Sequence, residues 1–177
     1  DANEGYTHED ALNFALEAKK CGLKFFEQPI PSKDLDFMNT ITTKSSIPIC
    51  SDEGVHSKKD INDIINNRTS NGVSLKTIKL GGMVDVMNCA IFANENNISV
   101  NLAGKVAETS ISSYAIANIA TSIPQMKWDL SITNQYLVED PVLEPLNIKD
   151  GKVFIKEIIG LGTEIDMHKA KKYIIQI

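Results

Sequence analysis

A regular alternation between short apolar runs and longer amphipathic segments is the feature of the sequence that most constrains its fold. Five runs, about 25 residues apart, are expected to be strands. They lie at 23–26, 47–50, 74–80, 98–102 and near 126–128. A helical pattern follows each run except the last, and this order is typical of a parallel sheet. The even repeat favours a barrel over an open doubly wound sheet, and the first run lacks the glycine-rich turn of a dinucleotide-binding fold.

Capping residues predict where the helices begin. Thr7 with Asp10, and Ser57 with Asp60, each fit a capping box in front of an apolar stripe. Ser32 is expected to cap the next helix after the first strand. The other apolar stripes at helical spacing lie at 35–41, 86–93 and 111–119.

The end of the chain departs from the repeat. Asp150-Gly151 lies between the apolar segments 146–149 and 152–155, and this dipeptide strongly favours a two-residue β-hairpin. We therefore expect a barrel portion at 1–140 and a tail at 141–177 whose hairpin packs outside the barrel. The predicted fold class is α/β, a partial TIM-type (β/α) barrel with a C-terminal β-hairpin tail.

Composition excludes several classes of partner. A net charge of −5 and a pI near 5.2 argue against a nucleic acid or an anionic membrane, because phosphate binding needs a basic surface. No apolar run reaches the roughly 18 residues of a membrane span. Cys21, Cys50 and Cys89 are odd in number and far apart, which argues against a disulfide framework and against zinc. A reduced, cytoplasmic setting is expected.

Four polar residues lie about one strand–helix unit apart: Asp1, where a strand would be finishing, Glu27 and Asp52 after the first two runs, and Lys76 within the third. The C-terminal ends of parallel barrel strands meet at one face, so these side chains are expected to converge there. Three carboxylates repel one another unless a cation lies between them, and hard oxygen ligands suit Mg²⁺, with Mn²⁺ as a substitute. A single acid at a strand end is more commonly a helix cap, and a single strand lysine is more commonly on the surface. The joint pattern favours a metal site.

Lys79 is expected to be structural. It lies three residues after Lys76, and along a regular strand that spacing places the two side chains on opposite faces.

Four motifs occur in order at the spacing of the repeat: Asp1-Ala2-Asn3, Phe26-Glu27-Gln28-Pro29, Ser51-Asp52-Glu53 and Lys76 followed by Gly81-Gly82. Together they resemble the enolase superfamily. Within it, the chain resembles the mandelate racemase/muconate lactonizing enzyme family, particularly the lysine-using muconate-lactonizing subgroup. The resemblance runs over nearly all of the chain. Each motif is weak alone, but four in order are strong.

The resemblance implies the C-terminal part of a (β/α)7β barrel. It also implies that Asp1, Glu27 and Asp52 bind Mg²⁺ and that Lys76 is the catalytic residue.

Three further residues receive roles from the same resemblance. Asn3 and Glu53 are expected to support the metal site, and Glu108 is expected to contact the substrate. The subgroup also has a Lys-x-Lys pair and an N-terminal capping domain, both of which would precede Asp1. We therefore expect this chain to be the C-terminal fragment of a longer enzyme, with an incomplete active site when isolated.

The activity that the resemblance implies is that of an isomerase or lyase. Such an enzyme removes the proton next to a substrate carboxylate, and the metal stabilises the resulting enediolate. A muconate-cycloisomerase-like reaction, or a racemase or epimerase reaction on amino-acid derivatives, is expected first, and dehydration of a hydroxy acid stays open. The expected partners are a small carboxylate substrate and further copies of the chain in a homo-oligomer.

Two alternatives remain open. The chain can be a catalytically silent fragment or assembly domain, since it lacks the Lys-x-Lys pair. It can also be a metal hydrolase on a similar barrel, although such sites usually use histidine ligands and the three histidines are poorly spaced for one.

Overall fold

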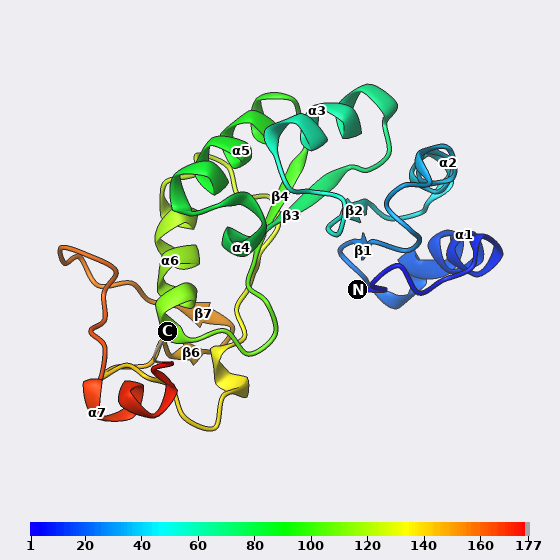
Figure 1. Cartoon of the computed structure of the whole chain (residues 1–177). Helices are drawn as coiled ribbons and strands as arrows, with labels where there is room; N and C mark the ends of the chain where they lie inside the picture. The colour runs from blue at the N-terminus through cyan, green and yellow to red at the C-terminus, as the bar shows by residue number, and fades with distance from the viewer. Residues whose placement is uncertain (176–177) are drawn as a thin grey trace.

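Five short parallel strands, adjacent in space in their sequence order, form the framework of the chain, which a computed structural model describes over residues 1–175 (Figure 1). The strands are β1 (Phe26–Glu27), β2 (Ile49–Ser51), β3 (Gly72–Leu75), β4 (Ser99–Ala103) and β5 (Leu130–Ser131). All four neighbouring pairs are parallel, and in the register Cys50 lies beside Gly72, which lies beside Ser99. This order, with at least one helix on each of the four crossovers, confirms the predicted partial barrel.

Helices connect the strands and pack as a layer on one face of the sheet (Figure 1). They are α1 (His8–Glu17), α2 (Leu35–Lys44), α3 (Lys58–Asn67), α4 (Thr77–Leu80), α5 (Met83–Glu95) and α6 (Ser110–Thr121). A 3-10 turn, η1 (Ala18–Cys21), extends α1 and ends at Gly22 with a left-handed φ of 68°. Across residues 1–175, none of the helices combines the length and the hydropathy that crossing a membrane would require.

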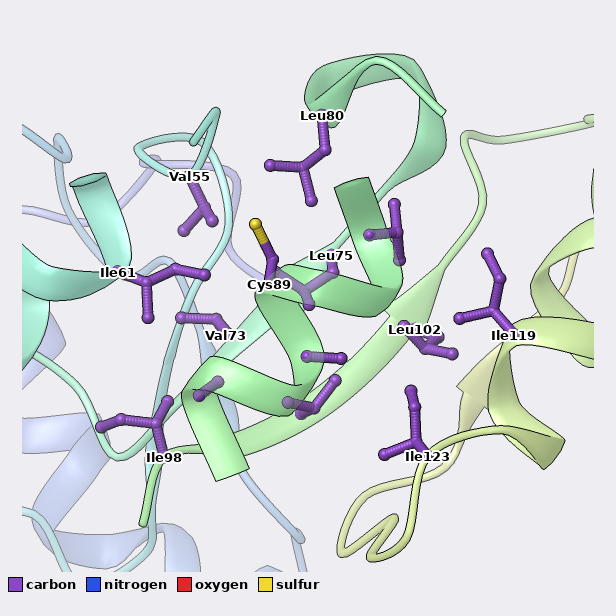
Figure 2. Close-up of a cluster of buried hydrophobic side chains, with 14 of the residues drawn as sticks. Val55, Ile61, Val73, Leu75, Leu80, Cys89, Ile98, Leu102, Ile119 and Ile123 are labelled. Atoms are coloured by element: carbon purple, nitrogen blue, oxygen red, sulfur yellow. The ribbon is translucent and has the colours of Figure 1, made fainter. Parts of the chain in front are cut away.

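Side chains on the strands alternate between the two faces of the sheet. Val73 and Leu75 of β3 and Leu102 of β4 pack against Ile61 of α3 and Cys89 of α5 in the main apolar core, as Figure 2 shows. The residues between them therefore face away from the helices, toward the inside of the partial barrel. This inner face is polar, and it carries the candidate site.

The helix caps agree with the sequence at two of three positions. The Thr7 and Ser57 hydroxyls accept hydrogen bonds from backbone amides three residues later, at the starts of α1 and α3. The prediction of Ser32 as the cap of α2 is wrong. Asp34 directly precedes the helix and caps it, while the Ser32 amide donates to the Glu4 carboxylate at 2.7 Å.

The predicted strand at 74–80 is also wrong in its second half. β3 ends at Leu75, and α4 begins at Thr77 with Lys76 as its N-cap. The β-branched pair that starts the helix made this segment resemble a strand. Gly81, with a φ of 95°, ends the helical turn, and its amide donates to the Thr77 carbonyl oxygen at 3.1 Å. A strand thus becomes a helix at the point where Lys76 lies.

The two outer strands are shorter than expected and lie later in the sequence. β1 starts at Phe26 instead of residue 23, and Leu23 is exposed. β5 starts at Leu130, after the apolar run near Trp128. Trp128 is buried and stacks on Phe25, with ring centroids 4.3 Å apart. The segments just before β1 and β5, which were predicted as strands, therefore contact each other through these two rings.

The predicted hairpin is confirmed. β6 (Ile148–Lys149) and β7 (Lys152–Val153) pair antiparallel across Asp150 and Gly151, whose φ angles of 51° and 69° fit a type I′ turn. The hairpin packs against α6, outside the sheet, through the apolar cluster of Tyr114, Ala117, Ile132, Leu146, Ile148 and Val153. The remaining short elements are η2 (Asn134–Tyr136), α7 (Met167–Ala170) and η3 (Lys171–Tyr173).

A buried carboxylate attaches the segment after β5 to α6. The Asp140 side chain accepts hydrogen bonds from the Ser110 amide at 2.9 Å and from the Ser110 hydroxyl at 2.6 Å. Ser110 is the first residue of α6, so Asp140 satisfies donors that the start of the helix leaves free.

Gly72 should not tolerate a side chain. A Cβ atom at this position would lie 2.2 Å from the Trp128 ring and 2.7 Å from the Ser99 carbonyl oxygen. We therefore expect Gly72→Ala to lower the free energy of unfolding by about 1–3 kcal/mol, measured by urea denaturation with circular dichroism. Adding Trp128→Phe should recover part of the loss because it removes the ring atoms that clash. A loss that the second substitution leaves unchanged would contradict this account.

Candidate active site

Three of the predicted residues come together on the inner face of the sheet. Glu27 is the last residue of β1, Asp52 follows β2, and Lys76 follows β3. The Lys76 ammonium group contacts the Asp52 carboxylate. Glu27 is linked to the same strand as Lys76, because the Ser74 hydroxyl donates to its Oε1 atom at 2.6 Å. Successive strand ends therefore place two carboxylates and one amine in one region.

Asp52 lies at the centre of this region and is only 3% exposed. Its backbone amide donates to the side-chain oxygen of the fully buried Gln28 at 2.9 Å. One carboxylate oxygen contacts the Lys76 ammonium group, and the other contacts the ammonium group of Lys79. Two cations therefore offset the cost of burying this charge.

The prediction that Lys79 faces away from the site is wrong. Lys79 also donates to the Asp52 backbone carbonyl oxygen at 2.6 Å. The prediction assumed a regular strand, but α4 replaces the strand after Lys76. Side chains three residues apart share a face in a helical turn. Gly81-Gly82, which ends α4, was the sequence signal that a strand of this length was unsuitable.

The environment of Glu27 opposes its ionisation. Burial raises the pKa of its carboxyl group, and the negative charge of Asp52 raises it further. The Ser74 hydrogen bond and the positive charge of Lys76 act in the opposite direction but are outweighed. A group of this kind is disfavoured as a free anion and gains from a nearby cation.

The first residues of the chain lie beside β1. The Ala2 amide donates to the Glu27 carbonyl oxygen at 3.0 Å, and the Glu4 amide donates to the Gln28 carbonyl oxygen at 2.9 Å. This pairing places the backbone of residues 2–4 beside the end of β1, next to the site. The Asp1 side chain is exposed and accepts a hydrogen bond from the Asn3 amide at 3.0 Å.

Glu53 and Glu108 lie apart from these groups. Glu53 lines a cavity between α2 and α3 with Ser32, His56 and Thr69, and its buried Oε2 atom makes no hydrogen bond to the described residues. Glu108 accepts a hydrogen bond from the Ser112 hydroxyl on α6. Asn3 contributes a backbone contact to Asp1. The structure thus brings together Glu27, Asp52 and Lys76, but it does not bring Glu53 or Glu108 to them.

Ser74 and Asn101 were not singled out from the sequence, and both belong to the inner face. Asn101 donates to Ser74, which donates to Glu27. Both are polar residues inside apolar strands, and Ser74 lies two positions before Lys76. The period of two along a strand was the signal that could have identified them.

The carboxylates of the site have the chemistry that Mg²⁺ prefers. Glu27 and Asp52 offer oxygen donors on neighbouring strands, while the exposed Asp1 carboxylate accepts a hydrogen bond from the Asn3 amide. Within residues 1–175, no three His, Cys, Asp or Glu side chains are close enough together to form a metal-binding cluster. The oxygen donors of Glu27 and Asp52 fit Mg²⁺ by their chemistry. In this structure the positive charges next to Asp52 are those of Lys76 and Lys79.

Comparisons with known proteins bear on the family and the fold of the chain. The family model described as "Enolase C-terminal domain-like" matches residues 1–169. A chloromuconate cycloisomerase of Cupriavidus pinatubonensis is 28% identical over 174 residues, which are 98% of this chain and 46% of that protein. An o-succinylbenzoate synthase of Listeria innocua is 27% identical over 173 residues, also 98% of this chain and 46% of the relative. The chain spans about half the length of the curated relatives it matches.

Solved structures share the fold. A muconate lactonizing enzyme of Pseudomonas fluorescens, complexed with muconolactone, aligns with a TM-score of 0.91 at 23% identity over 98% of this chain and 47% of the other. A dipeptide epimerase of Cytophaga hutchinsonii, complexed with Mg and the dipeptide D-Ala-L-Val, aligns with a TM-score of 0.85 at 22% identity over 93% of this chain and 45% of the other.

Removing the charge of Asp52 should destabilise the chain. We expect Asp52→Asn to lower the free energy of unfolding by about 3 kcal/mol in magnesium-free buffer, because Lys76 and Lys79 lose their counter-charge. Urea denaturation followed by the fluorescence of Trp128, the single tryptophan, measures the change. Asp63→Asn is the control, since Asp63 pairs with the exposed Lys59 and should matter little. Equal losses in the two variants would contradict the assignment.

Glu27→Gln should raise the melting temperature of the metal-free chain at pH 7. Because the folded-state pKa of Glu27 is raised, its contribution to stability is present below the ordinary glutamate pKa and is lost as the pH rises through the raised value. The difference between variant and parent should therefore shrink as the pH falls toward the ordinary value of 4.5.

Thermal denaturation at several pH values in the presence of a chelator makes this measurement. Glu17→Gln is the matched control, because Glu17 is an exposed residue paired with Lys20. A Glu27→Gln advantage that stays constant across the pH range would show that the charge is not its cause.

Proposed function

The chain belongs to the enolase C-terminal domain-like family, and from this we propose that it forms the metal-binding half of an isomerase or lyase active site for a carboxylate substrate. The observation that carries the proposal is the convergence of Glu27, Asp52 and Lys76 at three neighbouring strand ends. A fold alone would not support it, because one fold serves many reactions.

We assign Asp1, Glu27 and Asp52 as the residues that would hold Mg²⁺. When bound, this ion would stabilise the negative charge that develops on a substrate carboxylate as the neighbouring proton leaves. The protein contributes carboxylates that are already oriented: Asp52 is fixed through Gln28 and two lysines, and Glu27 is fixed through Ser74. Their burial also keeps bulk water from competing for the site.

Lys76 is proposed to move the proton. Its Nζ atom lies at the carboxylate cluster, so it can accept or deliver a proton at the carbon next to a carboxylate bound there. General acid–base catalysis of this kind contributes about 10²–10⁴ to a rate. Lys79 remains on Asp52 when Lys76 turns toward the substrate, so the aspartate keeps one counter-charge.

The substrate is proposed to be a small carboxylic acid. The relatives include cycloisomerases, a synthase and an epimerase, whose net reactions differ. Proton transfer to or from the carbon next to a carboxylate, by way of an enediolate, is a step that such reactions can share. We propose cycloisomerisation and racemisation or epimerisation as the leading outcomes, with dehydration next. Glu108 is proposed to contact the substrate, and Asn3 and Glu53 to support the metal ligands.

A second candidate is a catalytically silent assembly domain. The observation that favours it is the internal pairing of Asp52 with both Lys76 and Lys79, which satisfies the buried charge without any ion. In that case the two lysines are structural, and Mg²⁺ should not raise the stability of the folded chain.

Thermal denaturation with and without Mg²⁺ separates the two candidates. An ion bound only by the folded state should stabilise it by about 2.7 kcal/mol at a hundred times its Kd. Asp52→Asn should abolish the shift, and the control Asp63→Asn should keep it. The absence of a shift in the parent chain would contradict the metal-site proposal.

Deuterium exchange from solvent at the carbon next to the carboxylate, over a panel of acids, tests Lys76. Exchange that survives Lys76→Ala would remove this residue from the mechanism.

A further inference from the structure

A row of hydrogen bonds crosses the inner face of the sheet and ends at Glu27. The Ser131 hydroxyl on β5 donates to Asn101 Oδ1 at 3.3 Å. Asn101 Nδ2, on β4, donates to the Ser74 hydroxyl oxygen at 3.0 Å. The Ser74 hydroxyl, on β3, donates to Glu27 Oε1 at 2.6 Å. Every donor in the row is therefore directed toward the carboxylate on β1.

The chemistry of these groups fixes that direction. A carboxylate accepts hydrogen bonds, and a serine hydroxyl has one hydrogen to donate. Because Asn101 supplies a donor to the Ser74 oxygen, the hydrogen of Ser74 is left for Glu27. Cys50 also lies beside Ser74, with its Sγ atom 3.4 Å from the hydroxyl oxygen, but a thiol is a weak partner. With Nδ2 of Asn101 directed at Ser74, its Oδ1 atom is left to accept the Ser131 hydrogen.

The burial of the row indicates a function beyond packing. Ser74 is fully buried, and Asn101 is 2% exposed. Burying polar groups costs free energy unless each is hydrogen-bonded, so apolar side chains would be the simpler choice for stability alone. The opposite face of the same strands already supplies the apolar core, through Val73, Val100 and Leu102. The polar residues therefore need an explanation on their own side of the sheet.

We propose that Ser74 and Asn101 are positioning residues for Glu27. By holding Oε1, they leave Oε2 as the oxygen available to a cation. The inference rests on the proposed metal site, and it adds two residues that act on the metal through Glu27 without touching it. Partners of this kind orient a ligand and limit the conformations it must give up when the ion binds.

Mg²⁺ affinity, measured by isothermal titration calorimetry on the 177-residue chain, tests the proposal. Ser74→Ala should weaken binding about 10–100-fold, as loss of a ligand's hydrogen-bond partner typically does. Asn101→Leu should weaken it in the same direction, because the Ser74 hydrogen is no longer directed. Ser74→Thr, which keeps the hydroxyl, should restore most of the affinity. Cys50→Ala is the matched control: it alters another buried neighbour of Ser74 and should leave the affinity unchanged.

A second measurement needs no metal. Within residues 1–175, hydrogen bonds join Asn101 to Glu27 through Ser74 alone, so a double-mutant cycle of Asn101→Leu and Glu27→Ala reports whether the row acts as a unit. In magnesium-free buffer the effects on the unfolding equilibrium should be non-additive by about threefold or more. Additive effects would overturn the positioning role, and so would Ser74→Ala with unchanged Mg²⁺ affinity. A parent chain that binds no Mg²⁺ but shows the coupling would overturn the metal site while keeping the row.

Discussion

The buried carboxylate of Asp52 is the interaction on which the rest of the site depends. A charge at this depth is tolerated only where partners replace the water it has lost. Gln28 from the end of β1 holds its backbone, and Lys76 and Lys79 from the end of β3 hold its oxygens. Three consecutive strand ends are thus linked through one residue, Asp52. The strand-to-helix change after Leu75 contributes to this arrangement, because the helical turn brings Lys79 to the same carboxylate as Lys76.

The buried carboxyl groups of Glu27 and Asp52 are stabilised by different partners. Asp52 is surrounded by cations, whereas Glu27 has one hydroxyl donor and a raised pKa. A site with one neutralised and one under-neutralised carboxylate is biased toward accepting a further positive charge beside Glu27. Under the proposed function, a bound cation would relieve the unfavourable burial of this charge. The apolar core on the other face of the sheet is built from different side chains, so the unfavourable burial of Glu27 does not disturb its packing.

Much of this arrangement could be predicted from the sequence, because the signals are local. The repeat of strands and helices, the caps at Thr7 and Ser57, and the Asp150-Gly151 hairpin each depend on a few neighbouring residues. The convergence of Glu27, Asp52 and Lys76 followed from the topology of a parallel barrel. The errors arose where tertiary contacts outweigh local preference. The β-branched residues of α4 favour a strand, yet burial of Leu80 and the turn at Gly81 make the segment helical.

The direction of individual side chains was the least predictable property. Glu53 follows Asp52 in the chain, but alternation sends it to the cavity between α2 and α3. The same alternation places Ser74 in line with Lys76, so one periodic rule both removes a candidate from the site and adds another. Position along the chain identifies the strand end at which a residue lies. The alternation of side chains along the strand decides the face of the sheet to which its side chain points. A sequence motif considered without this alternation therefore overstates the role of adjacent acids. It also misses polar residues deeper in the strands, such as Ser74 and Asn101, which hold Glu27 in place.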